Sequence, residues 1–253
     1  MKKIKKHKFF RWGLSYPFST MDPIILYKRL KDEFGDLNWW PVDHSYHKYN
    51  GSDKEFEIII GAILTQNTAW SNVEKALDEL KKKKVLSISS ICNLDDMILR
   101  KLIKSSGFFN QKAVRIKNIS CYLRDNYSSN LDLFFNQDLI VLREELLSLN
   151  GIGPETADSI LLYAGNKPIF VVDAYTKRIC KRLGLTDDLT YTSIQRYFQD
   201  FLSKVFSDDS LVKAYNELHA LIVIFAKDYC RKKPFCKSCP LNDVCSYAEI
   251  LAE

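Results

Sequence analysis

The 253-residue chain has few of the residues that interrupt helices and no long apolar runs. It contains 9 Gly and 7 Pro, with 46% hydrophobic and 27% charged residues, which excludes collagen-like, fibrous and disordered proteins. No uninterrupted apolar run approaches the roughly 20 residues of a membrane span, so no membrane partner is expected. The first 12 residues, MKKIKKHKFFRW, are basic but lack the apolar stretch and cleavage site of a secretory signal. We therefore expect a soluble, cytoplasmic protein.

The seven cysteines are unevenly distributed. Three lie singly on helical patterns: Cys92, Cys121 and Cys180. Four fall in one C-terminal stretch: Cys230, Cys236, Cys239 and Cys245. The odd total and the clustering argue against a disulfide framework and for a metal site. Four thiolates are enough to ligate a [4Fe–4S] cluster or a structural zinc ion.

Helical periodicity dominates the chain, and strand alternation is almost absent. Apolar residues recur at i, i+3 and i+4 over residues 55–66, 72–84, 94–105, 111–125, 139–149, 154–165, 174–184, 191–205 and 211–228. Only residues 169–172 form a short extended apolar run. Short turns join these segments, which predicts an all-α protein of two helical lobes with a site in the cleft between them.

Residues 149–157, LNGIGPETA, have the pattern of a helix-hairpin-helix turn. Gly151 and Gly153 flank Ile152 and permit a tight turn with bare backbone, and Pro154 stands where the next helix begins. Amide groups at that helix start can donate to a phosphate. The candidate DNA contacts of this turn are Gly151, Ile152, Gly153 and Thr156.

A second motif is the apolar run of residues 169–172, which ends in Asp173 just before a predicted helix. The aspartate can serve as a helix N-cap. Beside a DNA-holding hairpin, its carboxylate can also stabilise positive charge on a sugar and activate water. The basic residues that follow are candidate phosphate partners, in keeping with the net charge of +6: Lys177, Arg178, Lys181 and Arg182.

In this order and spacing, the hairpin, the aspartate and the cysteine loop resemble the endonuclease III superfamily of base-excision DNA glycosylases, with the helix-hairpin-helix-GPD (HhH-GPD) fold. The resemblance spans about residues 39–245. It implies double-stranded DNA with a damaged base as the partner, a base flipped from the stack, Asp173 as the catalytic carboxylate and Gln66 in the vacated gap. A monomer that acts near the nucleoid is expected.

The resemblance also implies domain boundaries. Residues 55–167 would form one helical domain, with the hairpin at about 144–165. Residues 22–54 and 168–253 would form the other lobe, with the cluster loop at 230–245, and residues 1–21 a basic extension. A [4Fe–4S] cluster is expected, with zinc as the alternative, although the first cysteine spacer is one residue shorter than usual. On this loop, Arg231 and Lys232 are candidate DNA contacts.

The chain departs from the bifunctional members at Glu155, which occupies the position of their Schiff-base lysine. A carboxylate cannot form that imine, so the presence of Glu155 predicts a monofunctional glycosylase. Glu155 is the second candidate, after Asp173, for a residue of the catalytic site. Adenine-mismatch members carry a glutamate where this chain has Gly61, which disfavours that specificity.

The aromatic candidates for a base pocket are Trp39 and Trp40, followed by Pro41, and Phe56. Together with residues 106–113, SGFFNQKA, they resemble bacterial 3-methyladenine DNA glycosylases of this superfamily. An alkylated purine is a flat cation, which aromatic faces attract. The alternatives are an endonuclease III-like glycosylase and lyase acting on oxidised pyrimidines or mismatches, and a DNA-structure binding protein without catalysis.

Overall fold

The computed structural model describes residues 21–248, and this part of the chain is helical without any strand. The basic segment of residues 1–20 lies outside the described residues. No helix of the described part is long and apolar enough to cross a membrane. The α-helices are α1 (Pro23–Phe34), α2 (His44–Asn50), α3 (Lys54–Leu64), α4 (Trp70–Lys82), α5 (Ile88–Asn93), α6 (Asp96–Leu102), α7 (Phe109–Tyr127), α8 (Leu131–Phe135), α9 (Leu139–Ser148), α10 (Pro154–Ser159), α11 (Ala174–Leu183), α12 (Tyr191–Leu202) and α13 (Asp208–Asp228).

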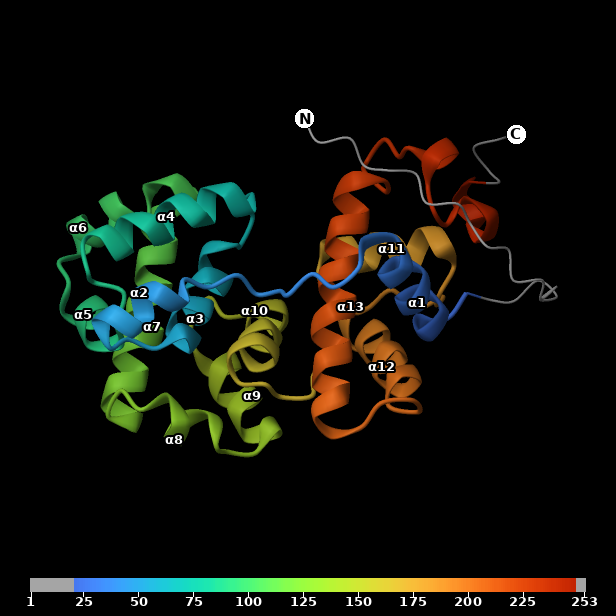
Figure 1. Cartoon of the computed structure of the whole chain (residues 1–253). Coiled ribbons are helices and arrows are strands. Elements are labelled where there is room, and N and C mark those ends of the chain that lie inside the picture. The colour runs from blue at the N-terminus through green and yellow to red at the C-terminus, as the bar shows by residue number, and fades with distance from the viewer. Residues whose placement is uncertain (1–20, 249–253) are drawn as a thin grey trace.

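Two groups of helices lie side by side (Figure 1). Helices α2 to α10 form one group, while α1 packs with α11, α12 and α13 in the other. The chain passes between the groups twice, through residues 35–43 and residues 165–173. Both crossing segments carry predicted site residues, so the fold itself brings these residues to the junction of the two lobes.

Four helices were missed by the sequence prediction. Three of them, α2, α5 and α8, have only 7, 6 and 5 residues, too few to display a helical period. The fourth, α1, begins at Pro23 and is capped by Asp22, whose carboxylate accepts from the Ile24 and Ile25 amides at 2.8 Å. The predicted extended run 169–172 is buried without joining a sheet in the described residues.

One disulfide corrects the prediction from cysteine counting. Cys92 of α5 and Cys121 of α7 are joined, with their Cα atoms 5.1 Å apart. Helical spacing alone placed both residues on separate segments and could not reveal that the α5 and α7 faces pack against each other. The remaining five cysteines of the chain are free.

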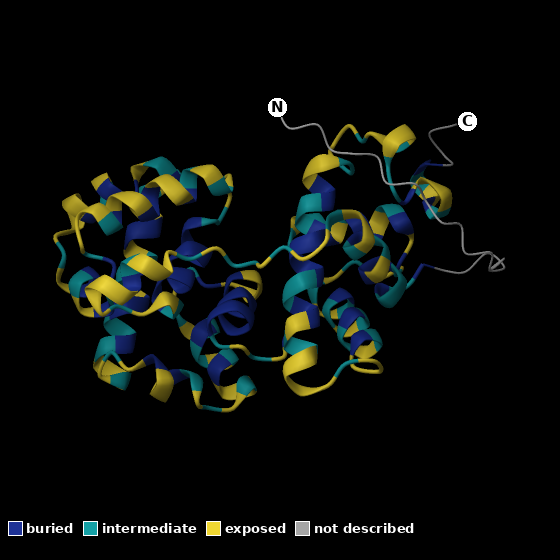
Figure 2. Ribbon diagram, viewed as in Figure 1, coloured by how far each residue is buried: buried dark blue, intermediate teal, exposed yellow. Residues whose placement is uncertain are grey.

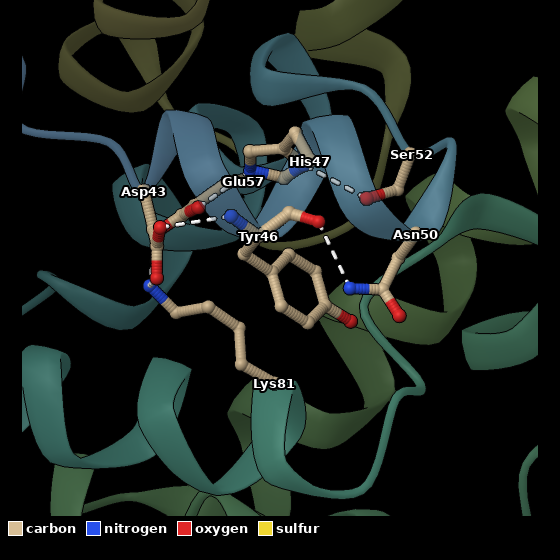
Figure 3. Close-up of polar contacts among 7 residues, drawn as sticks. All are labelled: Asp43, Tyr46, His47, Asn50, Ser52, Glu57 and Lys81. Atoms are coloured by element: carbon tan, nitrogen blue, oxygen red, sulfur yellow. Dashed lines mark hydrogen bonds and ion pairs between the residues drawn. The ribbon is translucent and has the colours of Figure 1, made fainter.

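A buried polar cluster fixes α2 against α3 and α4 (Figure 3). The carboxylate of Glu57, 2% exposed, accepts from His47 Nε2 at 2.6 Å and from Lys81 Nζ at 2.9 Å. The other ring nitrogen of His47 lies 2.8 Å from Ser52 Oγ, and Asp43 caps α2 through the Tyr46 amide. Since α2 directly follows residues 39–41, this cluster also anchors one end of the tryptophan segment.

Replacing Glu57 with Ala should destabilise the protein by about 3 kcal/mol, because His47 and Lys81 would lose a shared buried carboxylate. Urea unfolding measures the change. The matched control is Glu79→Ala, which removes an exposed pair with Lys82 and should cost less than about 1 kcal/mol. Equal effects of the two variants would contradict the role given to the buried cluster.

Candidate active site

Asp173 stands at the lobe junction as the N-cap of α11. Its Oδ1 accepts from the Thr176 amide at 2.7 Å and from Thr176 Oγ1 at 2.9 Å. Its Oδ2 accepts no hydrogen bond from any residue of the described chain, and the side chain is 13% exposed. The predicted N-cap role of Asp173 is confirmed: one oxygen fixes the carboxylate, and the other remains available for the catalytic role, which stays a prediction.

His219 and Tyr163, which the sequence reading missed, lie next to this available oxygen. His219 Nε2 is 3.8 Å from Asp173 Oδ2, and its Nδ1 is 2.5 Å from the Tyr163 hydroxyl. Tyr163 belongs to the π-helical segment η2 (Ile160–Ala164), which continues α10. Such segments are frequent at functional sites.

Glu155, in the first turn of α10, is electrostatically coupled to Asp173. Its side chain reaches solvent, but the surrounding protein and the charge of Asp173 raise its pKa to about 7, while Lys177 opposes this shift. Glu155 is therefore protonated in slightly acidic solution. Carboxyl groups with a raised pKa are common at sites for acid–base chemistry.

The tryptophan segment forms an aromatic wall beside these groups. The Trp40 ring centroid lies 5.2 Å from that of Tyr163 and 5.1 Å from that of Trp70, and Trp39 packs on both tryptophans. Trp40 Nε1 is buried without a partner among residues 21–248. A Cβ at Gly61 would lie 3.1 Å from Trp40 Cζ2, so the small residue makes room for the indole.

Two of the predicted pocket residues lie elsewhere. Phe56 is fully buried in the hydrophobic core on α3. Pro41 lines a separate cleft with Trp70 and Lys81. The sequence pattern therefore located the aromatic segment but not which of its members face Tyr163.

The hairpin and Gln66 form one hydrogen-bonded unit. Gln66 Nε2 donates to the Gly151 carbonyl at 3.1 Å and to Thr156 Oγ1 at 2.9 Å, and its Oε1 accepts from Arg115. Gly151 has a φ of +86°, and the Arg115 side chain covers the position that a Cβ would take. Ile152 is buried at 5% exposure, whereas Gly153 is exposed. Arg115 had no sequence signal, because its contact partners are far away along the chain.

Lys112 is a buried side chain that holds the backbone next to Gln66. Its ammonium group, 1% exposed, donates to the carbonyls of Leu64 at 2.8 Å and Ser106 at 2.6 Å, and burial lowers its pKa to about 8. These bonds fix the end of α3 just before Gln66 to the turn that precedes Phe108.

Phe108 is 64% exposed with a φ of +45°, a strained backbone of the kind that occurs at binding sites.

A buried carboxylate joins the two lobes. Asp158 of α10 is fully buried and receives hydrogen bonds from Arg143 of α9 and from two residues of α12, Tyr191 and Gln195, at 2.7 Å each. Gln195 also donates to the Phe170 carbonyl at 2.7 Å. The segment that leads to Asp173 is thereby tied to the hairpin helix.

The four C-terminal cysteines, which the sequence predicted as metal ligands, line one common cavity with Arg182 and Tyr247. Within residues 21–248, no three His, Cys, Asp or Glu side chains are placed to share a single metal ion. Burial raises the pKa of Cys239 to about 11 and also raises the pKa of Cys245, so these two thiols stay protonated unless a metal centre binds them.

Arginines predicted as phosphate partners instead hold the cysteine loop. Arg178 donates to the Cys230 carbonyl at 2.9 Å, and Arg182 donates to Cys230 Sγ at 3.2 Å and to the carbonyls of Arg231 and Lys232. Lys177, Lys181, Arg231 and Lys232 are exposed. The exposed cations therefore remain candidates for DNA contact, and the two arginines position the loop.

Comparison with known proteins agrees with this geometry. The family model described as "HhH-GPD superfamily base excision DNA repair protein" matches residues 60–204. A candidate DNA repair glycosylase of Methanocaldococcus jannaschii is 43% identical over 222 residues, covering 87% of this chain and 94% of the relative. The chain belongs to the HhH-GPD superfamily of base excision DNA repair proteins. It is a DNA repair glycosylase of the endonuclease III superfamily.

Solved structures show the same fold. The H. pylori 3-methyladenine DNA glycosylase (MagIII) bound to 1,N6-ethenoadenine has 28% identity and a TM-score of 0.66, covering 82% of this chain and 98% of that one. A trapped covalent intermediate of endonuclease III with DNA has 22% identity and a TM-score of 0.71, covering 90% and 96%. The predicted all-α HhH-GPD architecture is confirmed.

The hairpin geometry predicts opposite behaviour for its two glycines. Gly151→Ala should lower the free energy of unfolding by about 1–3 kcal/mol, because alanine would adopt a left-handed backbone and its Cβ would lie 2.2 Å from Arg115 Nε. Gly153→Ala meets no atom within 4 Å and should change stability by less than about 0.5 kcal/mol.

Urea unfolding and fluorescence anisotropy with duplex DNA at fixed salt measure the two effects. Because Gly153 would bring its bare backbone close to phosphate, its alanine variant should weaken DNA binding without loss of stability. A Gly151→Ala variant as stable as the parent protein would contradict the Arg115 contact.

Proposed function

We propose that this protein is a monofunctional glycosylase that hydrolyses the N-glycosidic bond of a flipped, alkylated purine such as 3-methyladenine in double-stranded DNA. The observation that carries the proposal is the Asp173 carboxylate, which has one oxygen fixed by Thr176 and the other available. It stands at the junction of the two lobes, next to His219. His219 contacts the Tyr163 hydroxyl, and the Tyr163 ring packs on Trp40.

Asp173 and the hairpin have different roles in the proposed hydrolysis. Breaking the glycosidic bond builds positive charge on the sugar, and the charge of Asp173 stabilises that oxocarbenium-like state. Its available oxygen can accept a proton from the attacking water. The hairpin amides and the basic residues nearby neutralise phosphates without reading sequence.

The substrate class rests on the aromatic wall. Trp40 packs on Tyr163, and its buried indole N–H has no partner among residues 21–248, which is suited to a flat base that carries a hydrogen-bond acceptor. A cationic alkylated purine gains cation–π attraction of about 0.5–2 kcal/mol on such a face, and its weakened glycosidic bond needs little acid catalysis. The similarity to the H. pylori enzyme supports the same class.

The monofunctional assignment rests on Glu155. At the position of the lyase lysine, this carboxyl group cannot attack the sugar as an amine. The proposed product is therefore an intact abasic site, and the protein works as a monomer on one lesion.

A [4Fe–4S] cluster is the proposed cofactor, held by Cys230, Cys236, Cys239 and Cys245. The four thiols line a shared cavity, and four cysteine thiolates are the usual ligand set of such a cluster; the family resemblance favours the cluster over zinc. Arg182, bonded to Cys230 Sγ, offsets negative charge there. The cluster would supply structure only, by shaping the loop that carries Arg231 and Lys232.

A second enzymatic candidate is an endonuclease III-like glycosylase and lyase on oxidised pyrimidines or mismatches, which the similarity to endonuclease III favours. Strand breaks without alkali and a borohydride-trapped complex would support it. A DNA-structure binder without catalysis would bind abasic duplex but release no base.

Asp173→Asn should abolish base release from methylated duplex DNA while leaving DNA affinity within about threefold, because the amide keeps the N-cap acceptor but carries no charge. Single-turnover base release and anisotropy give the two quantities. A variant that releases base at near the parent rate would refute the assignment of Asp173.

DNA affinity should fall as the pH rises through about 7, because Glu155 ionises there and adds negative charge beside the phosphate-binding hairpin. Glu155→Gln mimics the neutral form, so its affinity should be flat over that range. Anisotropy titrations between pH 6 and pH 8, at about constant ionic strength, make the comparison. Identical profiles for the two proteins would contradict this role of Glu155.

Cys239→Ser should lose the visible iron–sulfur absorbance and weaken DNA binding, because the loop that carries Arg231 and Lys232 would lose its shape. Iron and sulfide analysis of the parent protein should give about four of each per chain. Cys180→Ser, a buried cysteine outside the loop, is the matched control and should retain both. One zinc per chain and no sulfide would contradict the cluster.

A further inference from the structure

His219 is a buried polar side chain held between groups from two other elements. It lies on α13 and is 8% exposed. Its Nδ1 meets the Tyr163 hydroxyl of η2 at 2.5 Å, and its Nε2 lies 3.8 Å from Asp173 Oδ2. The Phe170 ring stands edge-on to the imidazole at 6.4 Å. No described residue bonds Nε2, although a buried ring nitrogen without a partner is costly.

The protonation of this pair follows from its surroundings. Burial lowers the pKa of His219, so the ring is neutral at pH 7 and carries one N–H. Burial and the charge of Asp173 hold the pKa of Tyr163 well above its usual value, so Tyr163 keeps its O–H. Because a lone pair on Nε2 would face the Asp173 carboxylate, the favoured tautomer has the proton on Nε2, and Nδ1 accepts from Tyr163.

This tautomer directs an N–H at the one oxygen of Asp173 that has no other partner within residues 21–248. A separation of 3.8 Å is too long for a direct hydrogen bond, so the proposed contact requires one of the two side chains to rotate. Building on the proposed function, we propose that Tyr163 and His219 are positioning residues for the reaction: Tyr163 fixes the tautomer, and His219 orients Asp173 and stabilises its charged form.

The groups that face Asp173 explain why such support matters. Glu155 of α10 disfavours a second negative charge nearby, while Lys177 of α11 opposes that effect from solvent. Thr176 fixes only the other oxygen. His219 of α13, backed by Tyr163 of η2, is therefore the neutral donor that can orient the available oxygen and stabilise its negative charge.

Single-turnover base release as a function of pH, together with DNA affinity, tests the proposal. His219→Phe should slow release at pH 7 by about 10- to 100-fold, the range for one lost hydrogen bond to a charged group. The acidic limb of its pH–rate profile should move upward by about one pH unit, and DNA affinity should stay unchanged. Tyr163→Phe should shift the limb in the same direction by less.

Two further variants separate this role from mere packing. His219→Gln restores an acceptor and a donor on one side chain and should recover most of the rate. Tyr215→Phe removes a hydroxyl from another buried tyrosine, on α13, and should leave the rate and the profile unchanged. Circular dichroism checks that each protein is folded.

The outcomes for these variants test the positioning role of His219 and Tyr163 separately from the proposed glycosylase function. If Asp173→Asn abolishes release while folded His219→Phe keeps the parent rate and profile, the positioning role is overturned and the proposed function stands. If Asp173→Asn itself remains active, the proposed function fails. If His219→Phe does not fold, the Tyr163→Phe and His219→Gln profiles decide: an unshifted limb in Tyr163→Phe, or no recovery in a folded Gln variant, overturns the proposal.

Discussion

The site depends first on the buried carboxylate of Asp158, which joins the two lobes. Arg143 compensates its charge from the same lobe, while Tyr191 and Gln195 reach it from the other. Gln195 also holds the Phe170 carbonyl, three residues before Asp173. A buried carboxylate without these donors would be strongly unfavourable, so the lobes are constrained to the arrangement that satisfies it. The distance between the hairpin and the Asp173 carboxylate follows from this constraint.

Around that junction, buried side chains form hydrogen bonds that fix the positions of the exposed residues of the candidate site. Lys112 bonds the carbonyls at the end of α3 and at the turn before Phe108, and Arg115 supports both Gln66 and Gly151. The cluster of His47, Glu57 and Lys81 fixes the helix that follows the tryptophan segment (Figure 3). Figure 2 shows the consequence: the ribbon of α10 and η2 is largely buried, with exposed positions at its hairpin end.

The sequence was most informative where function requires a local pattern. The two glycines of the hairpin, the aspartate that ends an apolar run and the four clustered cysteines each lie within a short stretch, so the sequence indicated them as candidates, and the family resemblance gave them their predicted roles. Most long helices were also predicted, because 10 or more residues show the helical period, although α1, with 12 residues, was missed. Short helices such as α8 could not be found in this way.

Long-range partners could not be predicted. Tyr163 and His219 are 56 residues apart, and each resembles an ordinary core residue on an apolar helix. The π-helical turn that carries Tyr163 has no sequence signature that a 3.6-residue period would reveal. The same limit hid the Cys92–Cys121 bond and the loop-holding roles of Arg178 and Arg182, because cysteine spacing and basic charge do not reveal which surfaces pack together.

The most direct test of the central claim is to identify the bases released from methylated, oxidised and mismatched duplexes by mass spectrometry, and to score strand breaks with and without alkali. The account predicts release of 3-methyladenine, with breaks only after alkali. Release of oxidised pyrimidines with breaks in the absence of alkali, or no release from any duplex, would contradict it.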